Sequence, residues 1–406
     1  MERFLKILIL SFYFPPDLSA GSFRTSALVD ALKRLGHEKL EVDVITTQPN
    51  RYSQIADTVD AIEDHGWLRI KRIELPAHNS GMRDQSVAFA KFAKRVLDLT
   101  KGNDWDMVYA TSSRLMTAAL GAHVARRLKL PLYLDIRDLF LDTMNDVLSG
   151  SHARHLLPVF KWLEKTTFQK ATRMSIVSKG FLDHLCGITS SSKFSVFTNG
   201  IDEIFLTSDF RKTTKSTDPA SLPCILYAGN IGEGQGLHHI LPQAAVALQN
   251  IARFRVVGGG GRAPLLHSTL DQTGLPDGVV ETSSPVPRAE LLEEYRQADI
   301  LFLHLNDYDA FRKVLPSKIF EYAATGKPVV AGVAGHAADF LKQHVPHAEV
   351  FDPCDVNGMI GAVKKAVKAP SHVDRSDFCR TYARSAIMDR MAKEMLTLIS
   401  SSKSGT

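Results

Sequence analysis

Cysteine is scarce in this sequence, and its few copies form no pattern. Cys186, Cys224, Cys354 and Cys379 lie far apart among 406 residues, without the paired spacing of a zinc site or a disulfide framework. No apolar run approaches the ~20 residues that cross a bilayer. A large excess of charge is also absent, because a net charge of +5 is too small and too dispersed to indicate a nucleic-acid partner. We therefore expect a cytoplasmic protein with reduced thiols, either soluble or peripheral on the inner face of the plasma membrane.

The chain is too long for one core of ordinary size, and its pattern falls into two series. In each series, short apolar or β-branched runs alternate with amphipathic stretches, which indicates βαβ units and a parallel sheet. A polar stretch without periodicity separates the two series. We expect α/β architecture, with a first doubly wound domain over 1–207, a linker over 208–222, a second such domain over 223–374 and a helical tail over 375–406. The expected strands are 7–11, 42–46, 69–73, 107–111, 132–134 and 174–178, and then 224–228, 254–257, 279–280, 300–303, 329–331 and 349–351.

The segment Leu315–Ala331 carries the strongest functional signal. Helix-start residues at Pro316-Ser317 and a helix-stop residue at Gly326 frame one short helix. Lys318 and Glu321 lie three residues apart and so share a face of it. Because a helix start attracts anions, Lys318 can bind a phosphate there while Glu321 accepts hydrogen bonds from hydroxyls. A nucleoside diphosphate with its ribose fits this pair, and plain complementarity of Glu321 to the helix dipole is the structural alternative.

Two glycine-rich loops follow strands of the second domain, at 229–236 and 258–261. Glycine lets backbone N–H groups approach a phosphate or a sugar without obstruction by a Cβ atom. Open α/β sheets bind ligands at the carboxyl ends of their strands, where both loops lie, although a plain turn remains an alternative for the first loop. The dehydrogenase pattern Gly-x-Gly-x-x-Gly is missing after the first strand of either sheet. The candidate donor-binding residues are Gly229, Asn230, Gly232, Gly258, Ser284, Ser317, Lys318 and Glu321.

Charged residues follow two strands of the first domain. The loop after the first strand holds small residues and leads into a helix, which suits a sugar or a phosphate, with Arg24 as the expected cation nearest to the incoming ligand. Asp135, Arg137 and Asp138 follow a later strand directly, where charges are costly in a core and expected in an active site. A structural ion pair between Arg137 and one aspartate remains the alternative. The acceptor or cleft candidates are Gly21, Ser22, Arg24 and Asp135, and the catalytic candidates are Lys318, Arg137 and Asp138.

The Lys318–Pro328 segment resembles the nucleotide-sugar signature of the retaining GT-B glycosyltransferases of family 4, in the subgroup similar to bacterial fucosamine-type transferases of surface polysaccharide biosynthesis. The resemblance covers nearly the whole chain and includes Gly21 and the Arg137-Asp138 pair. It implies two Rossmann-like domains facing across a cleft, the first for the acceptor and the second for the nucleotide sugar. It also implies that the tail returns to the first domain, and that the leaving phosphate receives the acceptor proton while configuration is retained.

Two departures from the family pattern bear on the donor. Asn230 and Gln235 stand near the places where relatives commonly carry an arginine and a lysine, so we expect the positive charge to come largely from Lys318. Lys313 replaces an earlier glutamate of the signature. Asp307 and Asp309, on the same loop, could compensate for that loss, although exposed loop aspartates are usually turn formers.

These features predict transfer of a hexosyl or N-acetylhexosaminyl group from a nucleoside diphosphate, with UDP as the expected nucleotide, to a hydroxyl of a glycan or lipid-linked glycan precursor. No cofactor or metal is expected, because the strand ends offer no Asp-x-Asp pair suited to magnesium. The basic amphipathic stretches Ser86–Leu99 and Leu156–Phe168 favour contact with an anionic membrane, although both also suit helices that cover a sheet. A GT-B nucleotide-sugar 2-epimerase and a non-catalytic binding module remain alternatives.

Overall fold

The computed structural model of the chain describes residues 4–17, 19–36, 39–49, 59–75, 82–112, 115–141, 157–211 and 222–403. The chain divides into two compact units, Met1–Asn199 with Arg384–Thr406, and Gly200–Ala383. The second unit begins earlier than predicted, because α7 (Glu203–Thr207) and Phe210 pack in its core. Of the predicted linker, residues 212–221 lie outside the described part. No helix in the described ranges combines the length and apolarity that a membrane span requires.

An eight-stranded sheet forms the centre of the first unit, in the order β3-β4-β2-β1-β5-β6-β7-β8. Its strands are parallel except β3, which runs antiparallel to β4. The middle strands are almost wholly buried apolar runs, as expected for a parallel sheet covered on both faces. The strands are β1 (Leu5–Leu10), β2 (Leu40–Thr47), β3 (Ile62–Asp64), β4 (Leu68–Ile73), β5 (Met107–Thr111), β6 (Leu132–Ile136), β7 (Arg173–Ile176) and β8 (Phe194–Val196).

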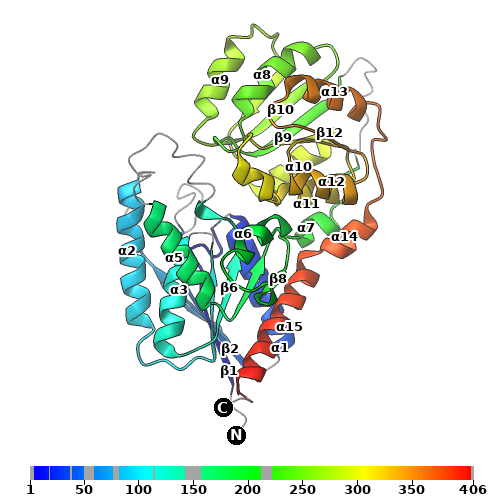
Figure 1. Cartoon of the computed structure of the whole chain (residues 1–406). Helices are drawn as coiled ribbons and strands as arrows, with labels where there is room; N and C mark the ends of the chain where they lie inside the picture. The colour runs from blue at the N-terminus through cyan, green and yellow to red at the C-terminus, as the bar shows by residue number, and fades with distance from the viewer. Residues whose placement is uncertain are drawn as a thin grey trace. The chain divides into compact units, whose positions relative to one another are not determined.

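Helices cover both faces of this sheet (Figure 1). Strand order reverses at β1, and right-handed crossovers therefore place α1 on one face and α2, α3 and α5 on the other. The helices are α1 (Ala20–Gly36), α2 (Met82–Leu99), α3 (Leu115–Leu128), α5 (Leu157–Lys170) and α6 (Leu182–Cys186), with single turns η3 (Lys179–Phe181) and η4 (Ser191–Lys193). The reversal leaves the β1 and β5 ends side by side at the switch point of the sheet.

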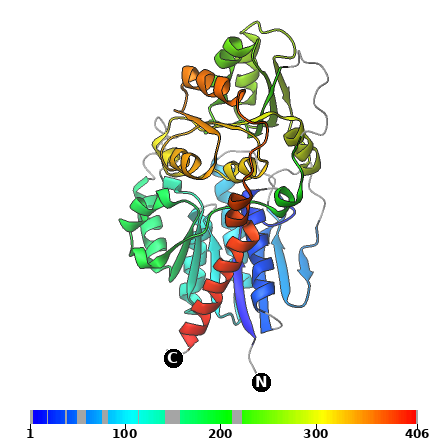
Figure 2. The ribbon, with the colours of Figure 1, turned by 90° about the vertical axis from the view of Figure 1, so that its right-hand side faces the viewer.

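The last helix, α15 (Arg384–Lys403), belongs to the first unit and runs beside α1, as Figures 1 and 2 show. Glu394 fastens it to the sheet. One carboxylate oxygen accepts a hydrogen bond from Tyr133 Oη at 2.7 Å, and the other accepts from Arg173 Nη2 at 2.9 Å and Ser195 Oγ at 2.5 Å. The tail was predicted as one continuous helix, but it forms two. The first, α14 (Ser376–Tyr382), belongs to the second unit, and the helix is interrupted at Ala383, where that unit ends.

The second unit has a parallel six-stranded sheet in the order β11-β10-β9-β12-β13-β14. Its side chains alternate between two cores, as period-two strands require. Ile225 and Tyr227 face the core under α8 and α13, whereas Leu226 and Ala228 face the core under α10, α11 and α12. The strands are β9 (Cys224–Asn230), β10 (Arg253–Gly259), β11 (Val280–Ser283), β12 (Ile300–His304), β13 (Val329–Gly332) and β14 (Ala348–Phe351).

Order in this sheet reverses between β9 and β12, so their carboxyl ends form its switch point. Both sheets thus confirm the predicted pair of doubly wound domains. The remaining elements are α8 (Leu237–Leu248), α9 (Ala263–Asp271), α10 (Arg288–Gln297), η5 (Asp309–Lys313), α11 (Lys318–Ala324), α12 (His336–His344) and α13 (Val356–Ala366).

Candidate active site

The structure brings Lys318 and Glu321 together at the start of α11. Lys318 Nζ lies 2.9 Å from Glu321 Oε2, and it also donates to Tyr295 Oη at 3.0 Å. Tyr295, from α10, donates in turn to Glu321 Oε2 at 3.2 Å. Ser317 occupies the N-cap position without a side-chain capping bond, so Glu321 is not a capping-box partner and its carboxylate is directed to the lysine. No sequence pattern indicated Tyr295, which lies on another helix.

Burial and charge act in opposite directions on this cluster. Burial lowers the pKa of Lys318, but the charge of Glu321 and its hydrogen bond outweigh burial and hold the pKa of Lys318 above its ordinary value. Burial, together with the neighbouring Glu321 charge, raises the pKa of Tyr295 well above the ordinary value of tyrosine. At neutral pH Lys318 is therefore an ammonium and Tyr295 is a neutral phenol.

Tyr322 fixes α11 against the end of β9. Its hydroxyl lies 3.3 Å from Ala228 N and 3.4 Å from Ala228 O, and both contacts are buried. This contact brings the lysine close to Gly229, where a Cβ atom would lie 3.8 Å from Lys318 Cε. Lys318 thus reaches the switch point of the second sheet, where the predicted glycine loop begins.

The glycine loop after β9 is held by the two residues that depart from the family pattern. Asn230 Nδ2 donates to Gln235 Oε1 at 2.7 Å, and Gly232 N donates to the same oxygen at 3.2 Å. Both side chains are therefore used to hold the loop closed on itself. Residues 229–236 of this loop include no lysine or arginine.

The second glycine run packs against the first. A Cβ atom at Gly258 would lie 1.8 Å from Gly229 O, and one at Gly260 would lie 2.5 Å from Ile231 O. No side chain fits at either contact, so these two glycines are explained by loop packing. Ser284 follows β11 and is exposed, and the next residue, Pro285, borders this glycine run at Gly259.

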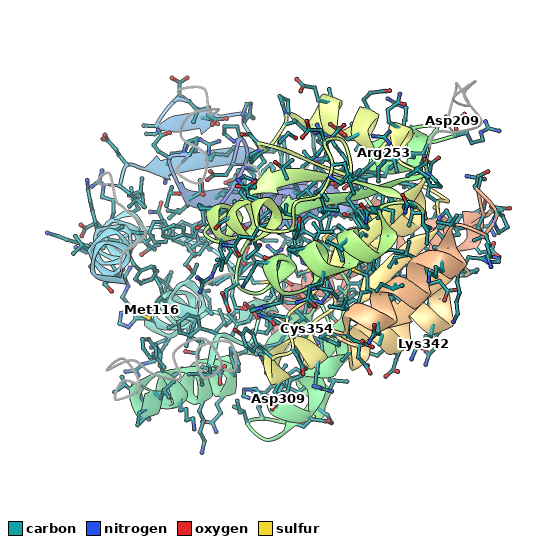
Figure 3. The ribbon with its side chains drawn as sticks, turned by 90° about the horizontal axis from the view of Figure 1, so that it is seen from above. Met116, Asp209, Arg253, Asp309, Lys342 and Cys354 are labelled. Atoms are coloured by element: carbon teal, nitrogen blue, oxygen red, sulfur yellow. The ribbon has the colours of Figure 1, made fainter. Side chains whose placement is uncertain are left out.

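A layer of polar side chains supports the glycine loop from β12, and sequence patterns did not reveal it. His304 Nε2 accepts from Cys354 N at 2.9 Å, so the ring proton is on Nδ1, which donates to Gln235 O at 2.6 Å. Burial lowers the pKa of His304 to about 4, so the ring is neutral. Asn306 Nδ2 donates to Glu233 O at 3.0 Å. Figure 3 labels Cys354, whose thiol contacts Asn306 at 3.2 Å.

The loop aspartates near Lys313 are occupied with an arginine. Asp307 pairs with Arg312 at 2.9 Å, and Asp309, labelled in Figure 3, has 94% of its side chain exposed. Neither replaces the missing glutamate of the signature in this arrangement. In the described ranges, no group of three His, Cys, Asp or Glu side chains is placed to hold a metal ion.

In the first unit, Arg24 and Asp135 form a fully buried ion pair, which differs from the expectation that both face a ligand. Arg24 donates to the two carboxylate oxygens at 2.8 and 2.9 Å, and its remaining nitrogen donates to Thr198 O at 2.7 Å. Tyr109 Oη, at 3.1 Å, and Ser175 Oγ complete the shell of Asp135. Burial raises the pKa of Asp135, but Arg24 more than offsets it and the pKa lies below its ordinary value. The aspartate is thus ionised and satisfied by protein donors.

Arg137 is therefore not the ion-pair partner of Asp135. Its guanidinium is partly buried and makes no hydrogen bond to any described residue, and its Nε is buried without a partner. It lies against Gly21 in the first turn of α1, where a Cβ atom would be only 2.4 Å from Arg137 Nη1. Ser22, the next residue of that turn, is buried, and Asp138 is exposed. Of the predicted residues in this unit, Gly21, Ser22 and Arg137 lie together.

Two family models match the chain. The first, described as "Glycosyl transferase 4-like domain", matches residues 21–199, and the second, described as "Glycosyl transferases group 1", matches residues 209–386. The chain is also 28% identical over 156 residues to a protein of Escherichia coli (strain K12) that is provisionally assigned to colanic acid biosynthesis as the glycosyl transferase WcaI. That match spans 38% of this chain and 38% of the relative.

Several solved structures share the fold at low sequence identity. Sucrose-phosphate synthase from Thermosynechococcus elongatus has a TM-score of 0.76 at 16% identity, with 98% of this chain and 100% of the other covered. Anabaena HepE in complex with UDP and glucose has a TM-score of 0.67 at 15% identity, with 96% and 99% covered. The two domain matches and the two doubly wound sheets together show that this chain belongs to the GT-B glycosyltransferases, with a family 4-like first domain and a group 1 second domain.

Proposed function

We propose that this enzyme transfers a hexosyl or N-acetylhexosaminyl group from a nucleoside diphosphate, with UDP as the nucleotide, to a hydroxyl of a glycan or lipid-linked glycan precursor in polysaccharide biosynthesis. The observation that carries the proposal is the cluster of Lys318, Tyr295 and Glu321 beside Gly229, at the switch point of the second sheet. The enzyme matches support it, because HepE is described in complex with UDP and with UDP-glucose, and the partial relative is assigned to colanic acid biosynthesis.

The hydrogen-bonding capacity left in the cluster matches the two ends of a nucleoside diphosphate. Lys318 uses two of its three ammonium protons on Tyr295 and Glu321, so one remains for a diphosphate oxygen. In the described part of the chain, Glu321 Oε1 has no hydrogen-bond donor, so it can accept from a ribose hydroxyl. Gly229 leaves the space beside Lys318 free of a side chain.

In the proposed mechanism, Lys318 stabilises the negative charge that develops on the departing diphosphate. The bond from the anomeric carbon to the diphosphate breaks as the bond to the acceptor oxygen forms, and the acceptor proton passes to the leaving phosphate with retention of configuration. Arg137 and Asp138 would be the catalytic residues of the first unit. No metal is required, because the fixed cations take that role, and full activity after chelation of divalent ions would support this.

The proposed acceptor is presented at a membrane surface by two helices of the first unit. On α5, Val159 and Trp162 are 58% and 64% exposed beside the exposed Lys161 and Lys165. On α2, Val87 is 62% exposed on a face that also carries basic residues at 91, 94 and 95. Exposed apolar side chains with basic neighbours favour anionic lipid, and a cytoplasmic peripheral location is part of this proposal.

Calorimetry with UDP tests the donor site. Glu321→Gln keeps the size of the side chain but removes the charge, and we expect it to weaken UDP binding by roughly 1.5–3 kcal/mol because charge-assisted bonds to the ribose are lost. The matched control is Glu290→Gln, at an exposed glutamate of α10, which should bind UDP as the wild type does. Equal affinity of folded Glu321→Gln and wild type would remove Glu321 from the site.

A further inference from the structure

Arg137 has no carboxylate partner among the described residues, because the nearby Asp135 pairs with Arg24. Asp135 is committed to Arg24 through two hydrogen bonds, and it is also saturated by Tyr109 and Ser175. In the described ranges, no carboxylate lies within ion-pair distance of Arg137. Burial, and then the charges of Arg24 and Arg384, lower the pKa of Arg137 to about 10 despite the opposing charge of Asp135. This guanidinium is held close to other cations without a partner of its own.

The position of Arg137 explains why its guanidinium N–H groups are not used in hydrogen bonds to the described residues. Its backbone N–H donates to Ser112 Oγ at 3.0 Å, which fixes the residue at the ends of β5 and β6. From there the side chain extends over Gly21, and no larger residue would leave room for it. Ser22, in the same turn of α1, is fully buried, and among the described residues its Oγ has no hydrogen-bond partner. The Arg137 guanidinium thus lies at the start of a 17-residue helix.

Keeping an arginine there costs folding free energy, because a charge that loses water without gaining a partner is destabilising. A planar guanidinium with its five donors unused matches one class of ligand above others, an oxyanion of phosphoryl type that it can bind bidentately. The helix start favours the same charge. We propose that Arg137, with the first turn of α1, binds a phosphoryl group of a substrate.

The proposed function, on which the identity of the substrate rests, offers two sources for that group. One is the diphosphate of the nucleotide sugar, and the other is a phosphate carried by the acceptor, as in a sugar phosphate or a lipid-linked diphosphate. Both have the same chemistry at Arg137. The two sources can be told apart by competition, because a nucleoside diphosphate should displace phosphate from a donor site but not from an acceptor site.

The first experiment measures binding of inorganic phosphate to the full chain by thermal shift and calorimetry, at constant ionic strength maintained with chloride. We expect phosphate to stabilise the wild type and to bind Arg137→Gln at least about tenfold more weakly. Without phosphate, Arg137→Gln should melt at the wild-type temperature or above it, because the substitution removes a charged group that has no hydrogen-bond or ion-pair partner among the described residues. The matched control is Arg126→Gln, at an exposed arginine of α3, which should retain phosphate binding.

The second experiment repeats the phosphate titration with saturating UDP, which also occupies Lys318. Phosphate binding that persists with UDP and is lost in Arg137→Gln assigns the site to an acceptor phosphate. Competition by UDP, with weaker UDP binding in Arg137→Gln, assigns it to the donor diphosphate. Arg137→Lys, which keeps the charge without the fork, should lose part of the affinity in either case.

Wild-type phosphate affinity in Arg137→Gln would overturn the proposal, and so would phosphate binding to neither protein. If Arg137→Gln does not fold, Arg137→Lys decides, because unchanged affinity in that variant contradicts bidentate recognition. A wild type that binds phosphate through Arg137 but does not bind UDP would leave this site intact and refute the proposed function instead. The two failures are thereby distinguishable.

Discussion

Replacing Asp135 by asparagine should destabilise the first unit more than any surface substitution. The change keeps the side-chain size but turns one of the two acceptors into an NH₂ donor that faces the donors of Arg24. Arg24 has only 1% of its side chain exposed, so water cannot compensate the lost charge. Removing one partner of a buried pair costs about 3–5 kcal/mol. The hydrogen bonds from Tyr109 and Ser175 place the expected loss within that range.

Tryptophan fluorescence during urea unfolding can measure this loss in one unit alone. The sequence has three tryptophans, Trp67, Trp105 and Trp162, and all three belong to the first unit. Trp105 is a suitable probe because it is buried and donates to Asp43 at 2.8 Å. The unfolding transition of the first unit is therefore visible even if the second unit unfolds separately.

The matched control is Asp389→Asn, which breaks the pair with Arg34 on the surface of the same unit. Both of its side chains are more than 40% exposed, so the expected cost is at most about 1 kcal/mol. A second variant, Arg24→Met with Asp135→Asn, removes the uncompensated charge and should recover part of the stability. The reasoning is refuted if Asp135→Asn costs no more than Asp389→Asn.

Three further predictions concern the donor site, the C-terminal helix and the membrane. Lys318→Met should lower turnover more than UDP affinity, because its charge acts chiefly on the leaving group, and equal losses in steady-state kinetics and calorimetry would contradict this. Hydrogen bonds from Arg173 and its neighbours hold the pKa of Glu394 below its ordinary value in spite of burial. Its stabilising effect is thus full above the ordinary glutamate pKa and lost as pH falls through the lowered one, so Glu394→Gln should flatten the acid limb of stability measured by urea unfolding. A Lys91/Lys94/Arg95→Ala variant should sediment less with anionic liposomes than the wild type, whereas equal sedimentation with neutral lipid would argue for a soluble acceptor.

Strands could be predicted from the sequence wherever burial is complete. The run 107–111 was predicted with the bounds that β5 has, because every residue in it is buried and apolar runs of that length between amphipathic stretches have few other solutions. The three-residue strands β3 and β8 were missed. Both are half-exposed and short, so their pairing depends on neighbouring strands more than on their own pattern.

The donor cluster shows what spacing can and cannot predict. Lys318 and Glu321 are three apart on one helix, so their contact at 2.9 Å follows from helix geometry. Tyr295 enters the same cluster from α10, because the second sheet places α10 and α11 over one face. In the sequence it looks like one more apolar residue of an amphipathic helix. Contacts between helices depend on tertiary packing, which a pattern within one helix does not contain.

Arg24 and Arg137 show that the pairing of charges is equally hard to predict from sequence. Arg24 and Arg137 both stand beside strand ends in the sequence, and either could be paired with Asp135. The direction of each side chain decides which arginine pairs with Asp135. Arg24 projects inward from α1 to this carboxylate, which is buried at the end of β6. Arg137 follows that strand and lies over Gly21 instead. The inward arginine stabilises the unit, and the other keeps its donors. The proposed ligand role therefore goes to Arg137, whose guanidinium makes no hydrogen bond within the described residues, and the residue type alone could not identify it.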